Sequence, residues 1–163
     1  MKAAAAFLLL FSIGFQALAG GSYRVGGVTP DFPFLALVYL AFFLKPTDAF
    51  LLACLTALAI DLFSLDPLGT RLLGYLPPIA LIGRIRQGFV SESVGLRAFL
   101  TLAASSIAFV LEAVYLCFRE GRWPGLWGEV GAAFYTALVG AAFHSLLDAY
   151  RSRRGWSRDR FFA

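Results

Sequence analysis

Apolar segments recur along the whole chain, and only short polar, proline-containing or glycine-containing stretches separate them. Hydrophobic residues make up 60% and charged residues 15% of the sequence, whereas a soluble domain is about 45–50% apolar and about 25% charged. No polar region is long enough to form a separate soluble domain. The sequence therefore predicts an all-α polytopic membrane protein, with one transmembrane helical bundle over residues 1–150 and a basic cytoplasmic tail at 151–163.

Six apolar segments are expected to be transmembrane helices, some of them short or kinked. At ~1.5 Å per residue, the second would extend only about 20 Å across a hydrocarbon core of about 30 Å. Pro77 and Pro78 remove two backbone donors from the fourth and are expected to kink or break it. Thr47 or Asp48 is expected to cap the third. The expected spans are 3–19, 32–44, 49–63, 72–83, 96–118 and 123–147.

The first apolar segment has two interpretations. It follows Lys2 and ends in Ala17-Leu18-Ala19 before Gly20, and this order is also typical of a cleavable secretory signal. A retained first helix is favoured over a cleaved signal. Both interpretations place Ser22 on the outer side of the membrane.

Basic residues are distributed unequally between the two ends of such a six-span bundle. One end collects Lys2, Lys45, Arg84, Arg86, Arg97 and the five arginines of the tail. The other end holds Arg24, Arg71, Arg119 and Arg122. The positive-inside rule therefore predicts that both termini are cytoplasmic, and it accounts for the net charge of +4 without nucleic-acid binding.

Acidic residues occur inside three of the expected spans, each at the outer end of a row of small residues. An ionised carboxylate in hydrocarbon costs several kcal/mol, so each acid needs a partner or a task. Asp61, Glu112 and Glu129 each continue an i, i+4 row of alanines. One hypothesis is that the three small-residue faces pack together and that the acids form an intramembrane polar cluster with Arg71. The alternative is that such rows arise by chance in a chain this rich in small residues.

Patterns typical of catalysis or of metal binding are not found in the sequence. It contains no G-x-S-x-G, no H-E-x-x-H and no phosphate-binding loop. Cys54 and Cys117 are far apart in apolar segments and are interpreted as buried hydrophobic residues. His144 and Asp148 are an i, i+4 pair, interpreted as an interfacial anchor rather than a proton relay. The protein is therefore expected to be no enzyme and to have no catalytic residue, metal or cofactor.

The segment from Thr29 to Tyr75 resembles a known family. Thr29-Pro30-Asp31 leads into an apolar span, and after a Lys-Pro turn the sequence reads L-A-I-D-L-F-S-L-D-P-L-G-T-R-L-L-G-Y. This order, in a chain of this size with six apolar segments, resembles MreD, the rod shape-determining membrane proteins. The Gly-Leu that usually precedes the acid is Ala57-Leu58 here. The family's recurrent positions correspond to Pro30, Asp31, Asp61, Pro67, Leu68 and Gly69.

The resemblance implies a non-enzymatic scaffold of the bacterial elongation (Rod) complex, in the inner membrane, required for cell shape and peptidoglycan side-wall synthesis. The implied direct partner is MreC, with RodA, a class B penicillin-binding protein and MreB in the wider complex and lipid around the bundle. The six family positions are candidates for structure or for partner docking. Apolar grooves around spans two to four are expected to receive the single transmembrane helix of MreC.

The same family is similar in fold to the S components of energy-coupling vitamin transporters. This similarity implies an alternative function, a six-helix substrate-binding protein with a small-molecule pocket open to the outside. Such a protein would need an outer loop able to cover the ligand. The expected outer loops at 20–31, 64–71 and 119–122 are short, and only the first is long enough, so the scaffold is favoured.

Overall fold

The computed structural model describes residues 2–19, 29–64, 67–88, 94–121 and 126–153. Within these ranges the chain forms six helices and no strand, which confirms the all-helical prediction. The helices are α1 (Lys2–Ala19), α2 (Phe32–Ala41), α3 (Pro46–Phe63), α4 (Thr70–Gly88), α5 (Val94–Glu120) and α6 (Leu126–Arg153).

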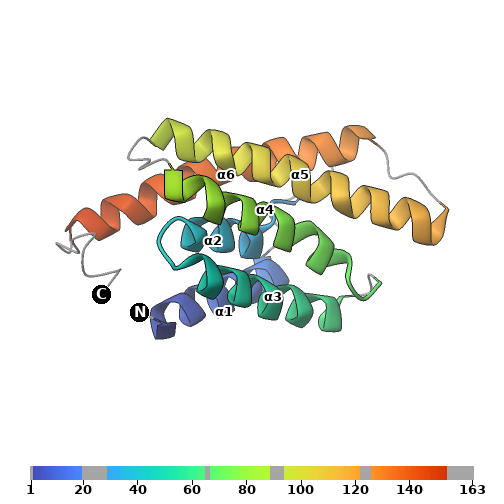
Figure 1. Ribbon diagram of the computed structural model, residues 1–163, viewed down its shortest axis with the longest axis horizontal. Coiled ribbons are helices and arrows are strands. Elements are labelled where there is room, and N and C mark those ends of the chain that lie inside the picture. The colour runs from blue at the N-terminus through green and yellow to red at the C-terminus, as the bar shows by residue number, and fades with distance from the viewer. Residues whose placement is uncertain (1, 20–28, 65–66, 89–93, 122–125, 154–163) are drawn as a thin grey trace.

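Successive helices run in opposite directions, so α1 begins and α6 ends at the same end of the bundle (Figure 1). The opposite end contains the last residues of α1, α3 and α5 and the first residues of α2, α4 and α6. This second end is called the Arg71 end below. Helix α3 packs mainly against α4, α4 also packs against α5, and α5 packs against α6.

The short helix α2 lies at the centre of the bundle. It contacts all five other helices, and every residue from Pro33 to Ala41 is buried. A helix that is apolar on all sides is stable only when other elements surround it, as they do here. The second span itself is therefore enclosed by the other helices. At ~1.5 Å per residue, α2 is also only about 15 Å long.

Helix α3 begins earlier than the sequence suggested. Its first residue is Pro46, and Lys45 occupies the cap position without a side-chain hydrogen bond. The prediction of Thr47 or Asp48 as the cap is wrong, because proline is well suited to the first helical position and the helix already starts at Pro46. Asp48 lies in the first turn, where its charge interacts favourably with the helix N-terminus.

Two other helices are longer than expected. Helix α4 contains both Pro77 and Pro78 and continues on either side of them, so the prolines do not end it. Packing against α3 on one side and α5 on the other supports the residues that lose backbone hydrogen bonds. Helix α6 continues to Arg153 and so includes the first three residues of the predicted basic tail, 151–153. The remainder of that predicted tail, 154–163, lies outside the described residues.

The rows of small residues are buried, but they do not meet as expected. Ala49, Ala53 and Ala57 on α3 are buried, as are Ala104 and Ala108 on α5. The hypothesis that all three faces pack together is wrong for α3 and α5, because α4 lies between them and packs against both, whereas α5 does pack against α6, which carries the third row. Helix α3 instead packs against α4, and Gly83 of α4 lies close to Pro46 at the start of α3. A Cβ placed at Gly83 of α4 would lie 3.3 Å from Cβ of Pro46.

Helix α6 approaches the centre of the bundle at a glycine. A Cβ placed at Gly140 would lie 2.7 Å from Cδ2 of Leu35 on α2 and 3.0 Å from Cγ2 of Thr101 on α5. Any larger residue would displace one of two buried side chains. Gly140 thus fixes the distance of α6 from both neighbours.

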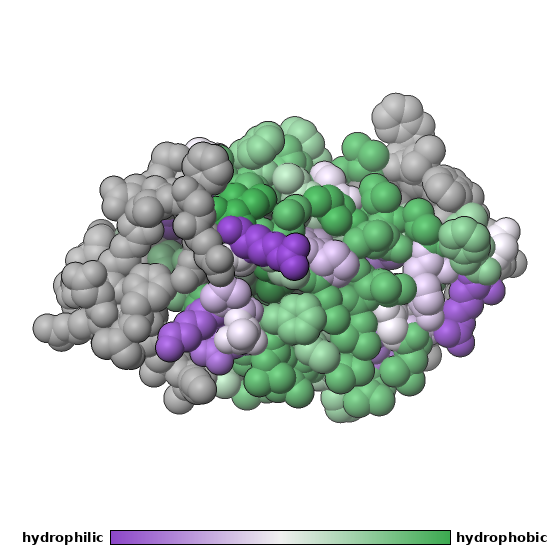
Figure 2. Space-filling model, viewed as in Figure 1, coloured by the Kyte–Doolittle hydropathy of each residue, from purple (hydrophilic) through white to green (hydrophobic). Residues whose placement is uncertain are grey.

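Large apolar side chains remain on the outer surface of the bundle. Phe7 of α1, Phe63 of α3, Phe118 of α5 and Leu138 of α6 are all more than half exposed. Figure 2 shows hydrophobic residues over the broad central part of one face. By length and composition, Pro46–Phe63 and Gly95–Arg119 can cross a membrane. Shorter apolar helices are Ala5–Leu18, Phe32–Ala41 and Val130–Leu146.

Candidate functional site

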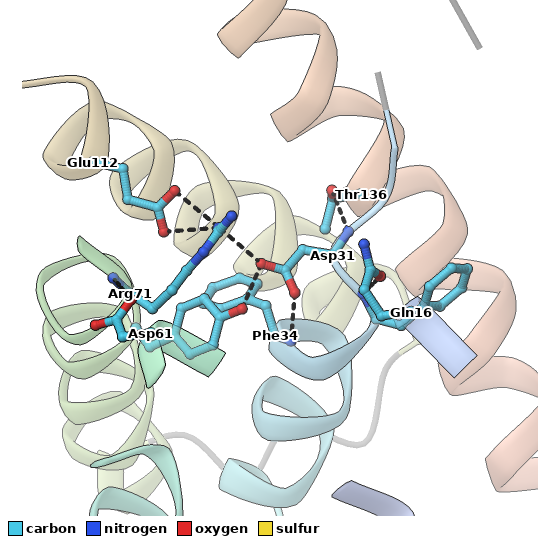
Figure 3. Close-up of polar contacts among 9 residues, drawn as sticks. Gln16, Asp31, Phe34, Asp61, Arg71, Glu112 and Thr136 are labelled. Carbon is cyan, nitrogen blue, oxygen red and sulfur yellow. Dashed lines mark hydrogen bonds and ion pairs between the residues drawn. The ribbon is translucent and has the colours of Figure 1, made fainter. Parts of the chain in front are cut away.

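An ion-pair cluster centred on Arg71 joins three helices at the Arg71 end. The guanidinium Nη1 of Arg71 donates to both carboxylate oxygens of Glu112, at 3.1 and 3.3 Å, and to Oδ2 of Asp31 at 3.5 Å. The three side chains are 25%, 10% and 15% exposed, respectively. Figure 3 shows the guanidinium between the two carboxylates. The cluster therefore links α4 to α5 and to the start of α2.

Asp31 is bound from several sides. Its Oδ1 accepts the backbone N–H of Phe34 at 3.0 Å, which makes Asp31 the N-cap of α2. Its Oδ2 accepts the hydroxyl of Tyr75 at 2.6 Å. Its backbone N–H donates to the hydroxyl of Thr136 on α6 at 3.3 Å. The first backbone N–H of α2, that of Phe32, donates to Oε1 of Gln16 on α1 at 3.2 Å.

Asp61 binds the backbone of the next helix. Its Oδ2 accepts the N–H of Gly69 at 2.8 Å, and its Oδ1 accepts the N–H of Arg71 at 3.0 Å. These are two of the N–H groups that the start of a helix leaves without an intrahelical acceptor. Asp61 is 3% exposed, and both of its carboxylate oxygens are used inside the chain. It is thus a cap for α4 that is supplied by the end of α3.

The Pro67-Leu68-Gly69 segment forms the turn that this cap stabilises. The carbonyl oxygen of Pro67 accepts two hydrogen bonds from Thr70, one from the backbone N–H at 3.1 Å and one from the side-chain hydroxyl at 2.6 Å. Gly69, the third residue of the turn, has φ +98°, a value that a type II turn requires and that other residues adopt at a cost. The carbonyl of Leu68 accepts the hydroxyl of Tyr115 on α5 at 3.0 Å. The turn is thereby joined to α5.

The structure brings the six family positions to the same end of the bundle. Pro30 is buried and precedes the cap of α2, and Asp61 with the Pro67–Gly69 turn caps α4. Of the predicted polar cluster, Arg71 and Glu112 form an ion pair, whereas Asp61 binds the backbone of Arg71 rather than its guanidinium. The side chain of Glu129 lies outside the described residues.

Asp31 is one of the six family positions, whereas no sequence pattern had pointed to Tyr75 or Gly74. Arg71 and Tyr75 are four residues apart, a spacing that places them on one helix face and could have identified Tyr75. A Cβ at Gly74 would overlap the carboxylate of Glu112. Gly74 therefore allows the Glu112 side chain to lie directly over the backbone of α4.

A cavity of about 650 Å³ opens beside the cluster. Asp31, Arg71, Tyr75 and Glu112 contribute to its polar wall. Residues from all six helices line it, and each of them lies toward the Arg71 end of its helix. The cavity and the ion-pair cluster thus form one candidate site.

His144 lies at the other end of the bundle and is not part of this site. It is 1% exposed, and its ring centroid is 5.4 Å from that of Tyr39 and 6.2 Å from that of Phe42. The interpretation of His144 as an interfacial anchor is wrong, because aromatic side chains of α2 and the following turn cover it. The side chain of Asp148 lies outside the described residues.

The described part of the chain contains no group of three His, Cys, Asp or Glu residues that could hold a metal ion. Comparison of the chain with protein-family models, curated proteins and solved structures gave no match.

Proposed function

We propose that this protein is a non-enzymatic scaffold of the bacterial elongation complex, which binds MreC and supports cell shape and side-wall peptidoglycan synthesis. One observation carries the proposal. The Pro30-Asp31, Asp61 and Pro67-Leu68-Gly69 positions, on which the resemblance to MreD rests, all contribute to helix starts at the Arg71 end. A motif used in this way supports a shared fold and, by analogy, a shared function. RodA, a class B penicillin-binding protein and MreB belong to the proposed wider complex.

We propose that the bundle crosses the inner membrane six times with both termini in the cytoplasm. The exposed apolar surface and the two sufficiently long apolar helices support a membrane location. The central helix α2 is too short to cross the hydrocarbon core by itself. The five helices that surround it enclose it within the bundle. The basic residues collected away from the Arg71 end support the orientation.

Thiol labelling tests this orientation. In a variant with Cys54 and Cys117 replaced by alanine, a membrane-impermeant maleimide added to cells is expected to label Leu68→Cys and not Thr47→Cys. Both positions are exposed, and they lie at opposite ends of the bundle. Labelling of Thr47→Cys alone would reverse the orientation, and equal labelling of both in intact cells would contradict a membrane-spanning bundle.

The outer side of α1 and α3 is the proposed docking surface for the transmembrane helix of MreC. Helix α1 packs mainly against α2, which leaves its other sides open. Phe7, Leu10 and Phe11 of α1 are exposed, as are Leu51 and Leu55 of α3. In lipid, helices associate by van der Waals packing, so the open apolar sides of α1 and α3 can receive a further helix.

Co-purification with MreC tests the scaffold function. Full-length MreC is expected to remain bound to this protein in mild detergent, and a photocrosslinker at Leu55 is expected to capture MreC. The matched control is Leu138, which is equally apolar and exposed but lies on α6. Failure of the two folded proteins to associate would contradict the scaffold function. Capture of MreC from Leu138 alone would place the docking surface on α6 instead of on α1 and α3.

The cavity favours a second candidate, the substrate-binding component of an energy-coupling transporter. Its volume falls within the range of about 300–1,000 Å³ that is typical of small-molecule sites. In the proposed orientation, the cavity lies toward the outside. A substrate-binding component would co-purify with a transport ATPase rather than with MreC, so the same experiment separates the two functions.

A further inference from the structure

Two basic side chains lie near each other at the end of the bundle opposite the Arg71 end. Lys45 precedes Pro46, the first residue of α3. Arg84 follows Gly83 of α4, and a Cβ at Gly83 would lie 3.7 Å from Cα of Pro46. Since consecutive Cα atoms are about 3.8 Å apart, the Cα atoms of Lys45 and Arg84 lie within about 13 Å of each other. Side chains of this length can therefore bind the same phosphate group.

Both cations are available to an anion from outside the protein. Lys45 and Arg84 are exposed, and neither side chain makes an ion pair with a described residue. Asp48 is three residues after Lys45, in the first turn of α3, and does not pair with it. An anion bound here would therefore displace no ion pair within the described part of the chain.

An exposed apolar row on α4 leads away from Arg84. Leu73, Pro77 and Leu81 are exposed, and their spacing places them on the same face of the helix as Arg84. At ~1.5 Å per residue, the row from Leu73 to Leu81 extends about 12 Å. Half of the hydrocarbon core of a bilayer is about 15 Å deep. The row is thus about as long as the acyl part of one leaflet.

Helix α3 adds an aromatic side chain beside this row. Phe50 is four residues after Pro46, so it lies on the side of α3 that faces Gly83 of α4. It is 43% exposed, as is Leu81. Figure 2 shows hydrophilic residues beside the hydrophobic part of the face at the end where α3 begins and α4 ends (left). The Lys45 face, as it is called below, consists of Lys45, Phe50, Leu73, Pro77, Leu81 and Arg84.

The order of groups on the Lys45 face matches that of a phospholipid. A phospholipid has its phosphate at the membrane interface and its acyl chains below, and the face has two cations followed by an apolar row. A zwitterionic lipid carries an ammonium group beside its phosphate, which the two cations would repel. An anionic phospholipid has no such group, and its charge complements that of the basic pair. A water-soluble phosphate would leave the apolar row uncovered.

We propose that the Lys45 face binds an anionic phospholipid. Lys45 and Arg84 bind the phosphate, and an acyl chain lies against Leu81 and Phe50. The proposal rests on the proposed membrane location, but not on the scaffold function. It leaves the proposed docking surface for MreC free, because that surface is formed by other residues of α1 and α3.

Native mass spectrometry of the full-length protein tests the proposal. Protein in maltoside micelles is given equal amounts of phosphatidylglycerol and phosphatidylcholine with the same acyl chains. The wild type is expected to retain at least tenfold more phosphatidylglycerol than phosphatidylcholine. Arg84→Gln is expected to reduce this preference at least threefold, and Lys45→Gln combined with Arg84→Gln is expected to abolish it. The matched control is Arg119→Gln, because Arg119 is also exposed but lies at the Arg71 end. It is expected to leave the preference unchanged.

Two measurements on the wild type cover the case in which a variant does not fold. A phosphatidylglycerol with a diazirine in its acyl chain is expected to crosslink to peptides that contain Phe50 or Leu81. Glycerol 3-phosphate, which has the phosphate but no acyl chain, is expected not to displace phosphatidylglycerol at a tenfold higher concentration. Displacement at that concentration would identify a phosphate site without lipid docking.

Several results would overturn the proposal. These are equal retention of both lipids by the wild type, full preference in the double variant, an equal loss in Arg119→Gln, crosslinks from α5 and α6 alone, and displacement by glycerol 3-phosphate. A wrong membrane location would be recognised separately, by equal thiol labelling of both cysteine variants in intact cells. A wrong scaffold function would be recognised by the absence of MreC after co-purification, with the lipid preference retained.

Discussion

Replacement of Arg71 with methionine is expected to reduce the free energy of unfolding by about 3 kcal/mol, the lower end of the range for breaking a buried ion pair. The lower end applies because the Arg71 side chain is 25% exposed. Without the guanidinium, the carboxylates of Asp31 and Glu112 lose the cation that both of them contact. The effect is measured as the midpoint of denaturant unfolding of the purified protein in detergent.

A second substitution separates this charge effect from lost packing. In Arg71→Met combined with Glu112→Gln, one of the two like charges is removed, so the double variant is expected to be more stable than Arg71→Met by at least about 1 kcal/mol. The control is Arg119→Met, because Arg119 is exposed and its guanidinium contacts the hydroxyl of Tyr115. Arg119→Met is expected to change stability by at most about 0.5 kcal/mol. A double variant less stable than Arg71→Met would contradict the charge argument.

Replacement of Asp61 with leucine is expected to destabilise the protein by about 2–3 kcal/mol, because two buried N–H groups would lose their acceptors. The groups are those of Gly69 and Arg71, at the start of α4. Burial of the apolar leucine side chain offsets part of this loss. The net destabilisation is therefore expected to be smaller than the combined free energy of the two hydrogen bonds. The predicted readout is a lower melting temperature, with cleavage by a protease near the turn at Pro67–Gly69.

Two controls accompany Asp61→Leu. Asp61→Asn retains an oxygen that can accept one N–H, and its cost is expected to be at most about 1 kcal/mol. Asp48→Leu removes a carboxylate from the first turn of α3, where it makes no side-chain hydrogen bond with the described residues. Its expected cost is about 0.3–1 kcal/mol, from the helix dipole alone. If Asp48→Leu were as harmful as Asp61→Leu, the capping role of Asp61 would be wrong.

The helices and the polar residues among them could be predicted from the sequence, because apolar periodicity and isolated acids are local signals. Arg71 and Glu112 were expected in one cluster, and they form an ion pair. Asp61 was expected to hold helices together, and it does so through backbone N–H groups. The sequence shows that an acid inside an apolar segment needs a partner. It does not show whether that partner is a guanidinium or the N–H groups at the start of a helix.

The arrangement of the helices could not be predicted, because it depends on contacts between distant residues. The alanine rows of α3 and α5 are alike in sequence, yet α4 separates them in the structure. Helix α2 was expected to be a short span, and its sequence does not show that the five other helices surround it. Asp31 is 105 residues from Thr136, which its N–H contacts, and no local pattern indicates such a pair.

The position of Arg71 in the chain also has a consequence for biosynthesis. A protein is made from its N-terminus, so α2 and α3 are available when α4 enters the bundle, and α5 is not. At that stage Asp61 can already bind the N–H of Arg71, and Asp31 can already bind its guanidinium. Glu112 arrives later with α5 and supplies the shorter ion pair. Arg71 thus has an acidic partner at each step, before α6 completes the bundle.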